Sequence, residues 1–417
     1  SSYKDFVSTA YIKNWSEIRE IVSEKNTVII DAVFGIGFKG ELESRLQNIF
    51  AEINSLKSKT VFAVDTPSGL YDYNQHQVCL KADYTISMAV KKFHSMFLKG
   101  REASGIIHTV DIGVSEKNFD NLNARNIFEV QEQDVRKIIP LRNINSHKYS
   151  TGKVFVLAGS KGLTGAAYLC SQSALISGCG AVMLGIPDSL NTILARKLTE
   201  VMTLPLNETA EHTLALSSCK KIQEKIKWCD ALLIGPGIAK NDETTGLISN
   251  VISENDIPIV LDADGLSAFK NLKLNRRKNK IILTPHLGEF ANLLDVSIDE
   301  LKNNLYNYSV DYAKKKNVIL VLKGSPSITT DGKQFYINST GNPALSTAGS
   351  GDVLAGIIAS LYSRTKNAID SAIAGVYVHG KSADLLCGKS KNNFTYKASD
   401  IVKIIPHAVS SILNTTA

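Results

Sequence analysis

Short apolar runs alternate with amphipathic stretches along most of the chain, and this alternation restricts the fold more than any other feature of the sequence. In the first series, a helical pattern at 41–57 lies among strand candidates at 27–33, 60–65, 82–88 and 106–111. A strand, a turn, a helix and another strand in succession predict a parallel sheet covered by helices. The first part of the chain is therefore expected to be an α/β domain.

A second and longer α/β series begins at Lys153, after a polar, Asn-rich segment at 115–133 that has no clear periodicity. We interpret that segment as a linker. A first domain with its linker is thus expected at 1–133, and a second domain at 134–417. Asp331-Gly332 between two β-prone runs predicts a hairpin. Helices are expected at 165–178, 352–362 and 368–386, and strands at 154–158, 181–186, 231–235, 258–262, 281–284 and 318–323.

The composition is that of a folded globular protein, because 44% of the residues are hydrophobic and 21% are charged. At roughly 150 residues per domain, the chain is long enough for two or three domains. The net charge of +7 includes no block of Lys and Arg, so we expect no nucleic-acid partner. No apolar stretch approaches the ~18 residues that would span a bilayer, so no membrane partner is expected. The six cysteines lack metal-binding spacing and are expected to be reduced thiols in a cytoplasmic protein.

The segment Gly349-Ser350-Gly351-Asp352 opens a strongly apolar helix and is typical of an anion-binding turn. Glycine lets the backbone approach a ligand closely, and the N–H groups at a helix N-terminus favour a phosphate there. Asp352 has two interpretations at this position. It is either a general base, which takes a proton from a hydroxyl as that oxygen attacks a bound phosphoryl group, or a residue that caps the helix.

Other polar segments follow strand candidates of the second domain, where ligands of open α/β sheets gather. Asp262 and Asp264 could place Mg²⁺ through water, or they could stabilise the turn after their strand. His286 is a candidate for a substrate contact or for a structural hydrogen bond. The polar segments are Asp262-Ala263-Asp264-Gly265, Thr284-Pro285-His286-Leu287-Gly288-Glu289-Phe290, Lys323-Gly324-Ser325 and Thr340-Gly341-Asn342-Pro343.

Together these motifs resemble the dehydratase domain of the NAD(P)H-hydrate repair family, which is a branch of the ribokinase-like fold. The resemblance covers residues 148–417. The glycine–Asp turn is shared with many small-molecule kinases, whereas the segment 284–290 together with Gly341-Asn342-Pro343 is much more specific. The further matching segments are 156–160, 164–167, 234–237, 261–264 and 322–324.

The resemblance implies roles for individual positions. Asp352 is the expected catalytic carboxylate facing the hydrate. Ala166, Gly237 and His286, together with Asp352, are expected to contact the hydrated nicotinamide nucleotide. The expected nucleotide-binding residues are Lys323, Gly324, Ser325, Pro326, Ser327, Gly349, Ser350 and Gly351.

By the same resemblance, the expected reaction is dehydration of the S form of NADH or NADPH hydrate with Mg²⁺ and ADP, or ATP in place of ADP. The hydroxyl of the hydrate is phosphorylated first and phosphate then leaves, because hydroxide is a poor leaving group. AMP and phosphate are the by-products when ADP is used. The family also implies a homo-oligomer. A ribokinase-like kinase for a vitamin precursor is an alternative, since it would share the glycine–Asp turn.

In the first domain, Gly35-Ile36-Gly37-Phe38-Lys39-Gly40 fits G-x-G-x-x-G after a strand and before a helix. Asp65 ends the next strand, where a ribose-binding acid would lie in a dinucleotide-binding Rossmann unit. From the residues alone, a dehydrogenase-type dinucleotide-binding unit and a scaffold without catalysis both remain open for this half.

The same segments, with 64–70 and 111–113, resemble the later part of the NAD(P)H-hydrate epimerase domain. This resemblance implies an incomplete Rossmann-like three-layer domain ahead of the ribokinase-like α/β domain. It implies Asp65 as the catalytic acid/base, and Asp31 and Ser68 as ligands of a potassium ion. The implied substrate contacts are Gly35, Ile36, Gly37, Phe38, Lys39, Gly40, Glu41 and Asp65.

The family's early phosphate loop, an Asn-Asn-Gly-Gly-Asp-Gly run, has no counterpart in these 417 residues. Without that loop, we expect no epimerase activity from the chain as given. If the gene encodes the loop, we expect the full protein to be bifunctional.

Overall fold

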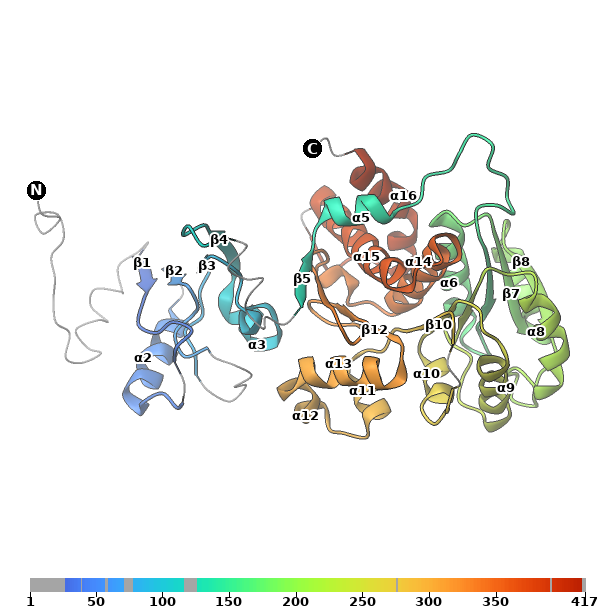
Figure 1. Cartoon of the computed structure of the whole chain (residues 1–417), viewed down its shortest axis with the longest axis horizontal. Coiled ribbons are helices and arrows are strands. Elements are labelled where there is room, and N and C mark those ends of the chain that lie inside the picture. Colours follow the sequence, from blue (N-terminus) through green and yellow to red (C-terminus); the bar gives the residue numbers. More distant parts are fainter. Residues whose placement is uncertain are drawn as a thin grey trace, which may run out of the picture. The chain divides into compact units, whose positions relative to one another are not determined.

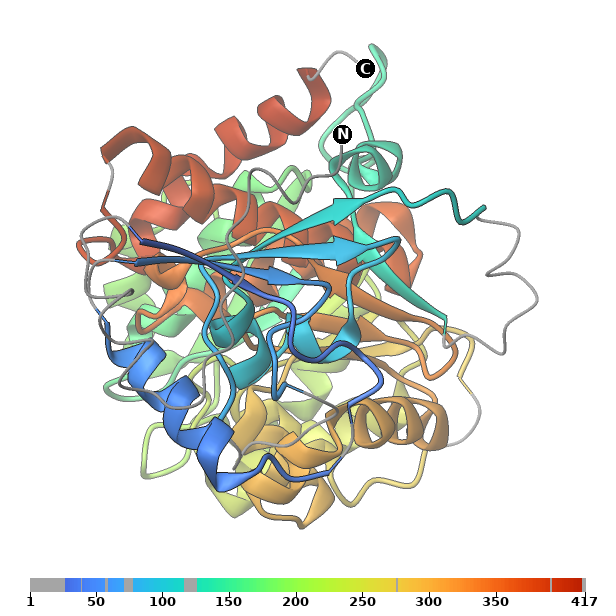
Figure 2. The same cartoon turned by 90° about the vertical axis from the view of Figure 1, so that its left-hand side faces the viewer.

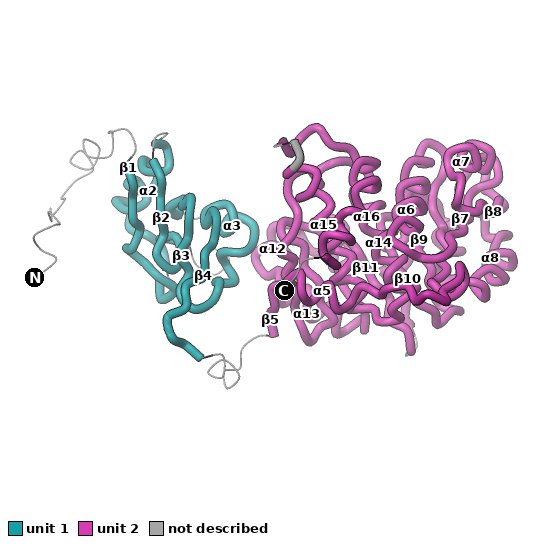
Figure 3. The backbone as a smooth tube through the Cα atoms, turned by 90° about the horizontal axis from the view of Figure 1, so that it is seen from above, with its two compact units in different colours: residues 1–124 teal, residues 125–417 magenta. Residues whose placement is uncertain are grey.

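The computed structural model describes residues 27–38, 40–56, 59–70, 78–115, 126–274, 277–390 and 392–414. The chain divides into two compact units, residues 1–124 and 125–417 (Figure 3). Both contain parallel β-sheets with helices packed on them, as predicted. The division falls before the boundary expected at Asp134, because Ile127–Val130 forms a strand of the second unit.

The first unit contains a four-stranded parallel sheet in the order β1-β2-β3-β4, whose strands run side by side in Figure 2. Phe50 and Ile53 of helix α2 (Ser44–Ser55) pack against Val61 and Ala63 on one face of this sheet. Helix α3 lies on the same face, since its Ser104 carbonyl accepts a hydrogen bond from the inward-facing Thr85. The remaining elements of this unit are β1 (Thr27–Asp31), β2 (Lys59–Val64), β3 (Tyr84–Met88), the short 3₁₀ helix η2 (Phe93–Met96), α3 (Leu98–Ser104) and β4 (Ile106–Val110).

The opposite face of the first sheet is apolar and largely exposed at its edges. Val28 and Ile30 of β1 are 60% and 70% exposed, and Ile106 of β4 is 58% exposed. The register places these side chains on one face, because Ile30 pairs with Phe62, Phe62 with Tyr84, and Tyr84 with Ile106. The described residues thus supply a sheet and one helical layer, which fits an incomplete three-layer unit.

The second unit is built on a ten-stranded sheet in the order β5-β14-β13-β12-β11-β10-β9-β6-β7-β8. The seven strands β12, β11, β10, β9, β6, β7 and β8, which are neighbours in this order, are all parallel. The hairpin strand β13 runs antiparallel to β12 and β14. The strands are β5 (Ile127–Val130), β6 (Lys153–Leu157), β7 (Ala181–Pro187), β8 (Met202–Leu206), β9 (Ala231–Ile234), β10 (Ile259–Leu261), β11 (Ile281–Leu283), β12 (Ile319–Leu322), β13 (Ile328–Thr330) and β14 (Phe335–Asn338).

Helices cover both faces of the ten-stranded sheet (Figure 1). The face that includes Val156, Leu233 and Val260 packs against α6, α14 and α15, and α16 and α5 add a second apolar cluster with these helices. The helices are α5 (Glu132–Ile138), α6 (Thr164–Ile176), α7 (Asn191–Lys197), α8 (Cys219–Ile226), α9 (Asp242–Glu254), α10 (Asp264–Phe269), α11 (Leu287–Leu294), α12 (Ile298–Asn303), α13 (Leu305–Lys316), α14 (Ser350–Thr365), α15 (Ala368–Ser390) and α16 (Ala398–Asn414), and the 3₁₀ helices are η3 (Asp188–Leu190), η4 (Leu216–Ser218) and η5 (Pro343–Leu345).

The predicted strands, the hairpin and the three predicted helices of this unit are present, with ends shifted by a few residues. Strand β8 was not predicted, because it contains Pro205, which interrupts the pattern of a strand. Strand β5 was not predicted because it lies in a segment whose polarity is typical of a linker. Helix α14 begins at Ser350 rather than at Asp352, so the glycine turn is part of the helix start.

Candidate active site

The polar segments singled out in the sequence follow adjacent parallel strands. Asp262 follows β10, Thr284 follows β11 and Lys323 follows β12. Because the carboxyl ends of parallel strands meet at one edge of the sheet, these side chains lie close together. The structure therefore brings them to the edge where the sequence predicted a site.

Asp262 is the centre of a buried polar cluster. Its side chain is 1% exposed, and Oδ1 accepts hydrogen bonds from Thr284 Oγ1 at 2.8 Å and Lys323 Nζ at 2.7 Å. Lys323 Nζ also lies 3.7 Å from Glu289 Oε2. Burial by itself would lower the pKa of Lys323, but the carboxylates of Asp262, Glu289 and Asp352 together raise that pKa above its ordinary value. Lys323 is thus held as a cation at the edge of the sheet.

Asp352 lies in the first turn of α14, but it does not cap the helix. The N-cap position belongs to Gly349, and the Asp352 side chain forms no hydrogen bond with any residue that the structure describes. Burial and the charge of Asp262 raise the pKa of Asp352 to about 7, against the opposing effect of Lys323. A carboxyl group with a pKa near neutrality can take up a proton at physiological pH. The geometry therefore fits the general-base interpretation and not the capping one.

The glycines of this turn are required by close packing. Gly349 has a φ of 88°, and a Cβ there would lie 2.5 Å from Leu169 Cδ1. A Cβ on Gly351 would lie 3.3 Å from Lys323 Nζ and 3.9 Å from Asp262 Oδ2. Lys323 thus approaches the start of α14, where backbone N–H groups favour an anion. A cation, a helix N-terminus and the Asp352 carboxyl are brought to one place, as phosphoryl transfer requires.

Residues 323–327 form the turn between β12 and β13. Ser327 Oγ donates a hydrogen bond to the Gly324 carbonyl at 3.2 Å, which closes the turn. Gly324 and Ser325 are exposed, whereas Pro326 and Ser327 are half-buried. The turn continues directly from the Lys323 cluster, so a nucleotide phosphate near Lys323 would lie next to it.

His286 has a structural hydrogen-bonding role and also an exposed edge. It caps α11, since Nδ1 accepts from the N–H groups of Gly288 at 3.0 Å and Glu289 at 3.2 Å, while Glu289 Oε2 accepts from the His286 N–H at 2.7 Å. Because Nδ1 accepts, the proton of the neutral ring is on Nε2. The side chain is 59% exposed and lines a cavity of about 750 Å³ with Asp264 and Lys240. Both interpretations of His286 are thus compatible, because Nδ1 caps the helix while the side chain, with Nε2 3.5 Å from Glu289 Oε1, also borders this cavity.

Gly237 and Ala166 meet where the loop after β9 approaches the first turn of α6. A Cβ on Gly237, whose φ is 66°, would lie 3.0 Å from Ala166 Cβ. Ser160 Oγ donates to the Gly237 carbonyl at 2.8 Å, which fixes this loop. Asp264 Oδ2 accepts from the Ala239 N–H at 3.2 Å, so Asp264 does stabilise a turn at this edge.

Substitution of Gly235 by alanine is expected to destabilise the second unit by roughly 3–5 kcal/mol. A Cβ there would lie 1.8 Å from the Asp262 carbonyl oxygen, and the φ of 128° is unfavourable for any other residue. The measurement is the thermal unfolding temperature of the variant. Gly246→Ala in α9 is the matched control, because no atom lies within 4 Å of its Cβ, and it should stabilise the protein by about 0.5–1 kcal/mol. Equal unfolding temperatures for the two variants would contradict the tight packing of this turn.

One contact of the glycine turn had no signal in the sequence. Ser350 Oγ lies 3.2 Å from Nε2 of His379, which is 6% exposed in α15. Burial lowers the pKa of His379 to about 4, so its ring is neutral at pH 7. The pair depends on the packing of α15 beside α14, which no local pattern reveals.

In the first unit, the structure brings Asp31 and Ser68 together. Asp31 Oδ2 accepts from the Ser68 N–H at 2.7 Å, and Oδ1 accepts from Ser68 Oγ at 2.5 Å. Ser68 Oγ in turn accepts from the Phe34 N–H at 2.9 Å. Both side chains are buried, so their oxygen atoms are fixed in position.

Asp65 and Gly35 are also close to each other. A Cβ on Gly35 would lie 3.9 Å from Asp65 Oδ2, and the φ of Asp65 is 71°. Asp65 forms an ion pair with Lys92, and Asp65 Oδ1 accepts from the Met88 N–H at 3.1 Å. Lys92 is a partner that the sequence did not indicate.

The other residues implied for this half form the exposed segment after β1. Phe38 is half-buried against Phe34, with ring centroids 4.5 Å apart. Lys39 lies outside the described residues. The exposed positions are Ile36, Gly37, Gly40 and Glu41.

Within the described ranges, no group of three or more His, Cys, Asp or Glu side chains could by itself hold a metal ion. Mg²⁺ in nucleotide sites is usually bound by one or two carboxylates, water and the phosphates of the substrate. In the same ranges, no helix is long and apolar enough to cross a membrane.

Comparison with known proteins identifies both units. Residues 154–407 match the family model described as NAD(P)H-hydrate dehydratase, and residues 5–93 match the model described as YjeF-related protein N-terminus. The chain is 33% identical over 393 residues to the bifunctional NAD(P)H-hydrate repair enzyme Nnr of Moorella thermoacetica, covering 92% of this chain and 73% of that protein. It is 29% identical over 417 residues to the enzyme of the same name from Dictyoglomus turgidum, covering 98% and 80%.

Solved structures resemble the second unit. The ADP/ATP-dependent NAD(P)H-hydrate dehydratase of Bacillus subtilis, co-crystallised with ATP and Mg²⁺, is 27% identical with a TM-score of 0.60. The similarity covers 69% of this chain and 100% of that chain. A ribokinase-like superfamily protein of Enterococcus faecalis has a TM-score of 0.61 at 22% identity, covering 71% and 99%, and supports the ribokinase-like fold.

Proposed function

Because this chain belongs to the family of bifunctional NAD(P)H-hydrate repair enzymes, in which a dehydratase and an epimerase unit are fused, we propose that its second unit dehydrates the S form of NADH or NADPH hydrate with ADP. The observation that carries this proposal is the Asp352 carboxyl, whose pKa is about 7, next to the Lys323 cation at the N-terminus of α14. A base, a phosphate-binding cation and a helix N-terminus are the components of phosphoryl transfer to a hydroxyl.

In the proposed reaction, Asp352 takes the proton of the hydrate's hydroxyl as that oxygen attacks the terminal phosphorus of ADP. The bond from this phosphorus to AMP breaks, and AMP leaves with the bonding electrons. The carbon–oxygen bond of the phosphorylated hydrate then breaks, phosphate leaves, and the neighbouring carbon loses a proton to restore the ring double bond. Bound Mg²⁺ would neutralise phosphate charge, and Asp262 and Asp264 would hold it through water.

The other residues position the two substrates. Lys323 and the turn at 324–327 are proposed to hold the nucleotide phosphates together with the N–H groups of 349–351. His286 Nε2, Ala166 and Gly237 are proposed to contact the hydrated nucleotide. Because the pKa of Lys323 is raised, its ammonium group carries the positive charge for this role across the physiological pH range.

Recovery of NADH absorbance tests this proposal directly. The purified protein is mixed with the S form of NADH hydrate and Mg²⁺, with ADP, with ATP, or without nucleotide. We expect recovery that requires a nucleotide and is faster with ADP. No recovery with either nucleotide would contradict the dehydratase assignment. Consumption of nucleotide with a vitamin-precursor alcohol in place of the hydrate would then favour a ribokinase-like kinase.

For the first unit, whose family's early phosphate loop has no counterpart in these 417 residues, we propose Asp65 as the acid/base of an epimerase site that this loop would complete, with the segment 35–41 contacting the substrate. The closeness of Gly35 to Asp65 and the strained backbone of Asp65 support this role. Asp31 and Ser68 supply buried oxygen atoms that fit a potassium ion. Such an ion would add positive charge near the phosphates of the substrate.

The R form of the hydrate tests the first unit in the same assay. If only the second unit is active, NADH is recovered from the R form no faster than the R form converts spontaneously to the S form. A faster rate that falls to the spontaneous one in Asp65→Asn would assign epimerisation to Asp65. A faster rate that is unchanged in this variant would contradict the role of Asp65. Recovery of the S form is the control, because it should be equal in both proteins.

A further inference from the structure

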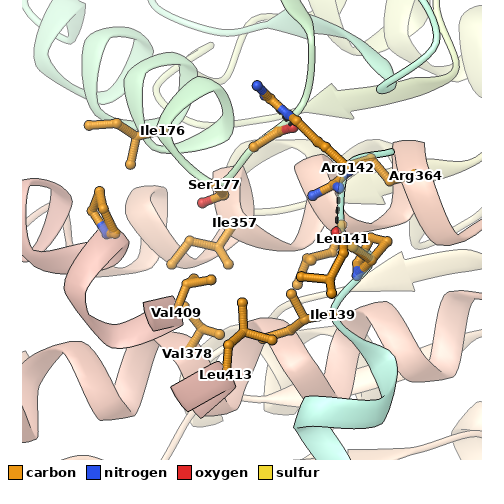
Figure 4. Close-up of a pocket in the computed structure, with 14 residues that line it drawn as sticks. Ile139, Leu141, Arg142, Ile176, Ser177, Ile357, Arg364, Val378, Val409 and Leu413 are labelled. Carbon is orange, nitrogen blue, oxygen red and sulfur yellow. Dashed lines mark hydrogen bonds between the residues drawn. The ribbon is translucent and has the colours of Figure 1, made fainter. Parts of the chain in front are cut away.

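A second cavity, of about 260 Å³, lies beside the C-terminal half of α14 (Figure 4). Its lining includes Ile357 of α14, Ile176 at the end of α6, and Val409 and Leu413 of α16. Arg364 at this end of α14 is about 18 Å along the helix from Asp352, at 1.5 Å per residue. The cavity is therefore separate from the candidate active site.

Two arginines give this apolar cavity a positively charged end. Arg142 is exposed and donates from Nη2 to the Gly178 carbonyl at 3.1 Å. Arg364 is half-buried and donates from Nη2 to the Pro140 carbonyl. In Figure 4 both side chains border the same side of the cavity, with Leu141 next to them. These bonds hold the two guanidinium groups in place at its rim.

The two guanidinium groups have no acidic partner in the described part of the chain. Neither Arg142 nor Arg364 lies within 4 Å of a carboxylate there, and Nε of Arg364 is buried without a hydrogen-bond partner. Asp230 lines the adjoining polar cavity, but it already pairs with Lys366 at 3.2 Å and Lys153 at 3.8 Å. Burial and the charge of Arg142 lower the pKa of Arg364, as expected for two cations without a counter-ion. A buried donor without a partner is unfavourable, and an anion between the two guanidinium groups would offset their combined positive charge.

We propose that this cavity binds a medium-chain fatty carboxylate, with the carboxylate at Arg142 and Arg364 and the alkyl chain between α6, α14 and α16. The planar guanidinium group matches the geometry of a carboxylate, and the apolar walls exclude a ligand that is polar throughout. An apolar cavity of about 150 Å³ holds one benzene ring, so 260 Å³ suits a ligand of roughly ten non-hydrogen atoms. Octanoate has this size.

Titration calorimetry with octanoate on the full chain tests the proposal. Octanol and octylammonium have the same chain without the negative charge, and we expect each to bind at least about tenfold more weakly than octanoate. Arg142→Gln should weaken octanoate binding by about tenfold, because Arg142 contributes a charge-assisted hydrogen bond. Arg196→Gln is the matched control, since Arg196 is an exposed arginine of α7 outside the cavity, and it should leave binding unchanged.

Filling the cavity is an independent test. Val409→Phe should abolish octanoate binding while leaving both arginines in place, and its circular dichroism shows whether it is folded. Octanoate binding that is absent, equal to that of octylammonium, or unchanged in Arg142→Gln would overturn the proposal. A stable dimer that does not bind octanoate, and that octanoate does not dissociate, would also overturn the proposal. In that case a second copy of the chain would close the cavity. Because binding is measured without turnover, this outcome does not depend on the dehydratase assignment.

Discussion

Replacement of Asp352 by asparagine is expected to lower the turnover rate of hydrate dehydration by roughly 10²–10⁴-fold, the usual contribution of a general base. Asparagine has the same shape but cannot accept the proton of the attacking hydroxyl. The affinity for ADP should remain within about twofold, since the N–H groups of α14 and the Lys323 cation are unchanged. The measurement is NADH recovery at saturating hydrate, with nucleotide binding followed by calorimetry. Comparable turnover in the variant would remove Asp352 from the mechanism.

A stability measurement distinguishes this loss from unfolding. The pKa of Asp352 is raised to about 7 in the folded protein, so the folded state favours the protonated carboxyl. The resulting stabilisation is fully present below the pKa of the unfolded chain and is lost as the pH rises through about 7. At pH 8 the ionised Asp352 therefore destabilises the fold, and Asp352→Asn should be more stable than the parent by roughly 2–4 kcal/mol. At pH 4 the two proteins should be nearly equal.

The fold of the second unit could be predicted largely because the central strands of its sheet are fully buried. The strands β9 and β12 have every residue buried, so they read as continuous apolar runs between polar turns. The strands of the second unit that escaped prediction are those at the edges of the sheet. β5 and β8 are the two outermost strands, and one contains Pro205. An edge strand needs less apolar sequence, and its place is set by the neighbour with which it pairs.

The site was predictable as a location but not as a set of contacts. The parallel strands bring Asp262, Thr284 and Lys323 to one edge, which follows from the order of strands and loops alone. The partner of each group depends on distances between segments far apart in the sequence. The Lys323–Asp262 ion pair joins residues 61 positions apart, and the Ser350–His379 contact joins residues 29 apart. That Asp352 does not cap its helix likewise emerges only from the start of α14 at Ser350, which places Gly349 at the N-cap.

Substitution of Lys323 by methionine is expected to affect both activity and stability. Asp262 would be left buried without its cation, and breaking a buried ion pair in this way costs about 3–5 kcal/mol. Lys323 also lowers the pKa of Asp352, so its removal should raise that pKa further. The ionised Asp352 is the active base, and the rate falls as the pH drops through its pKa. The acidic limb of the profile of kcat/KM against pH should therefore move upward by about one unit or more.

Glu289→Gln should move the same limb in the opposite direction. The charge of Glu289 raises the pKa of Asp352, so its neutralisation should lower that pKa and extend activity to lower pH. Glutamine can still accept the hydrogen bond from the His286 N–H, so the capping box of α11 is preserved and the fold should be little affected. Shifts of opposite sign in these two variants require a titrating group that senses both charges, and the pKa of Asp352 is lowered by Lys323 and raised by Glu289. Shifts of the same sign, or an acidic limb that neither variant moves, would show that another group controls the pH dependence.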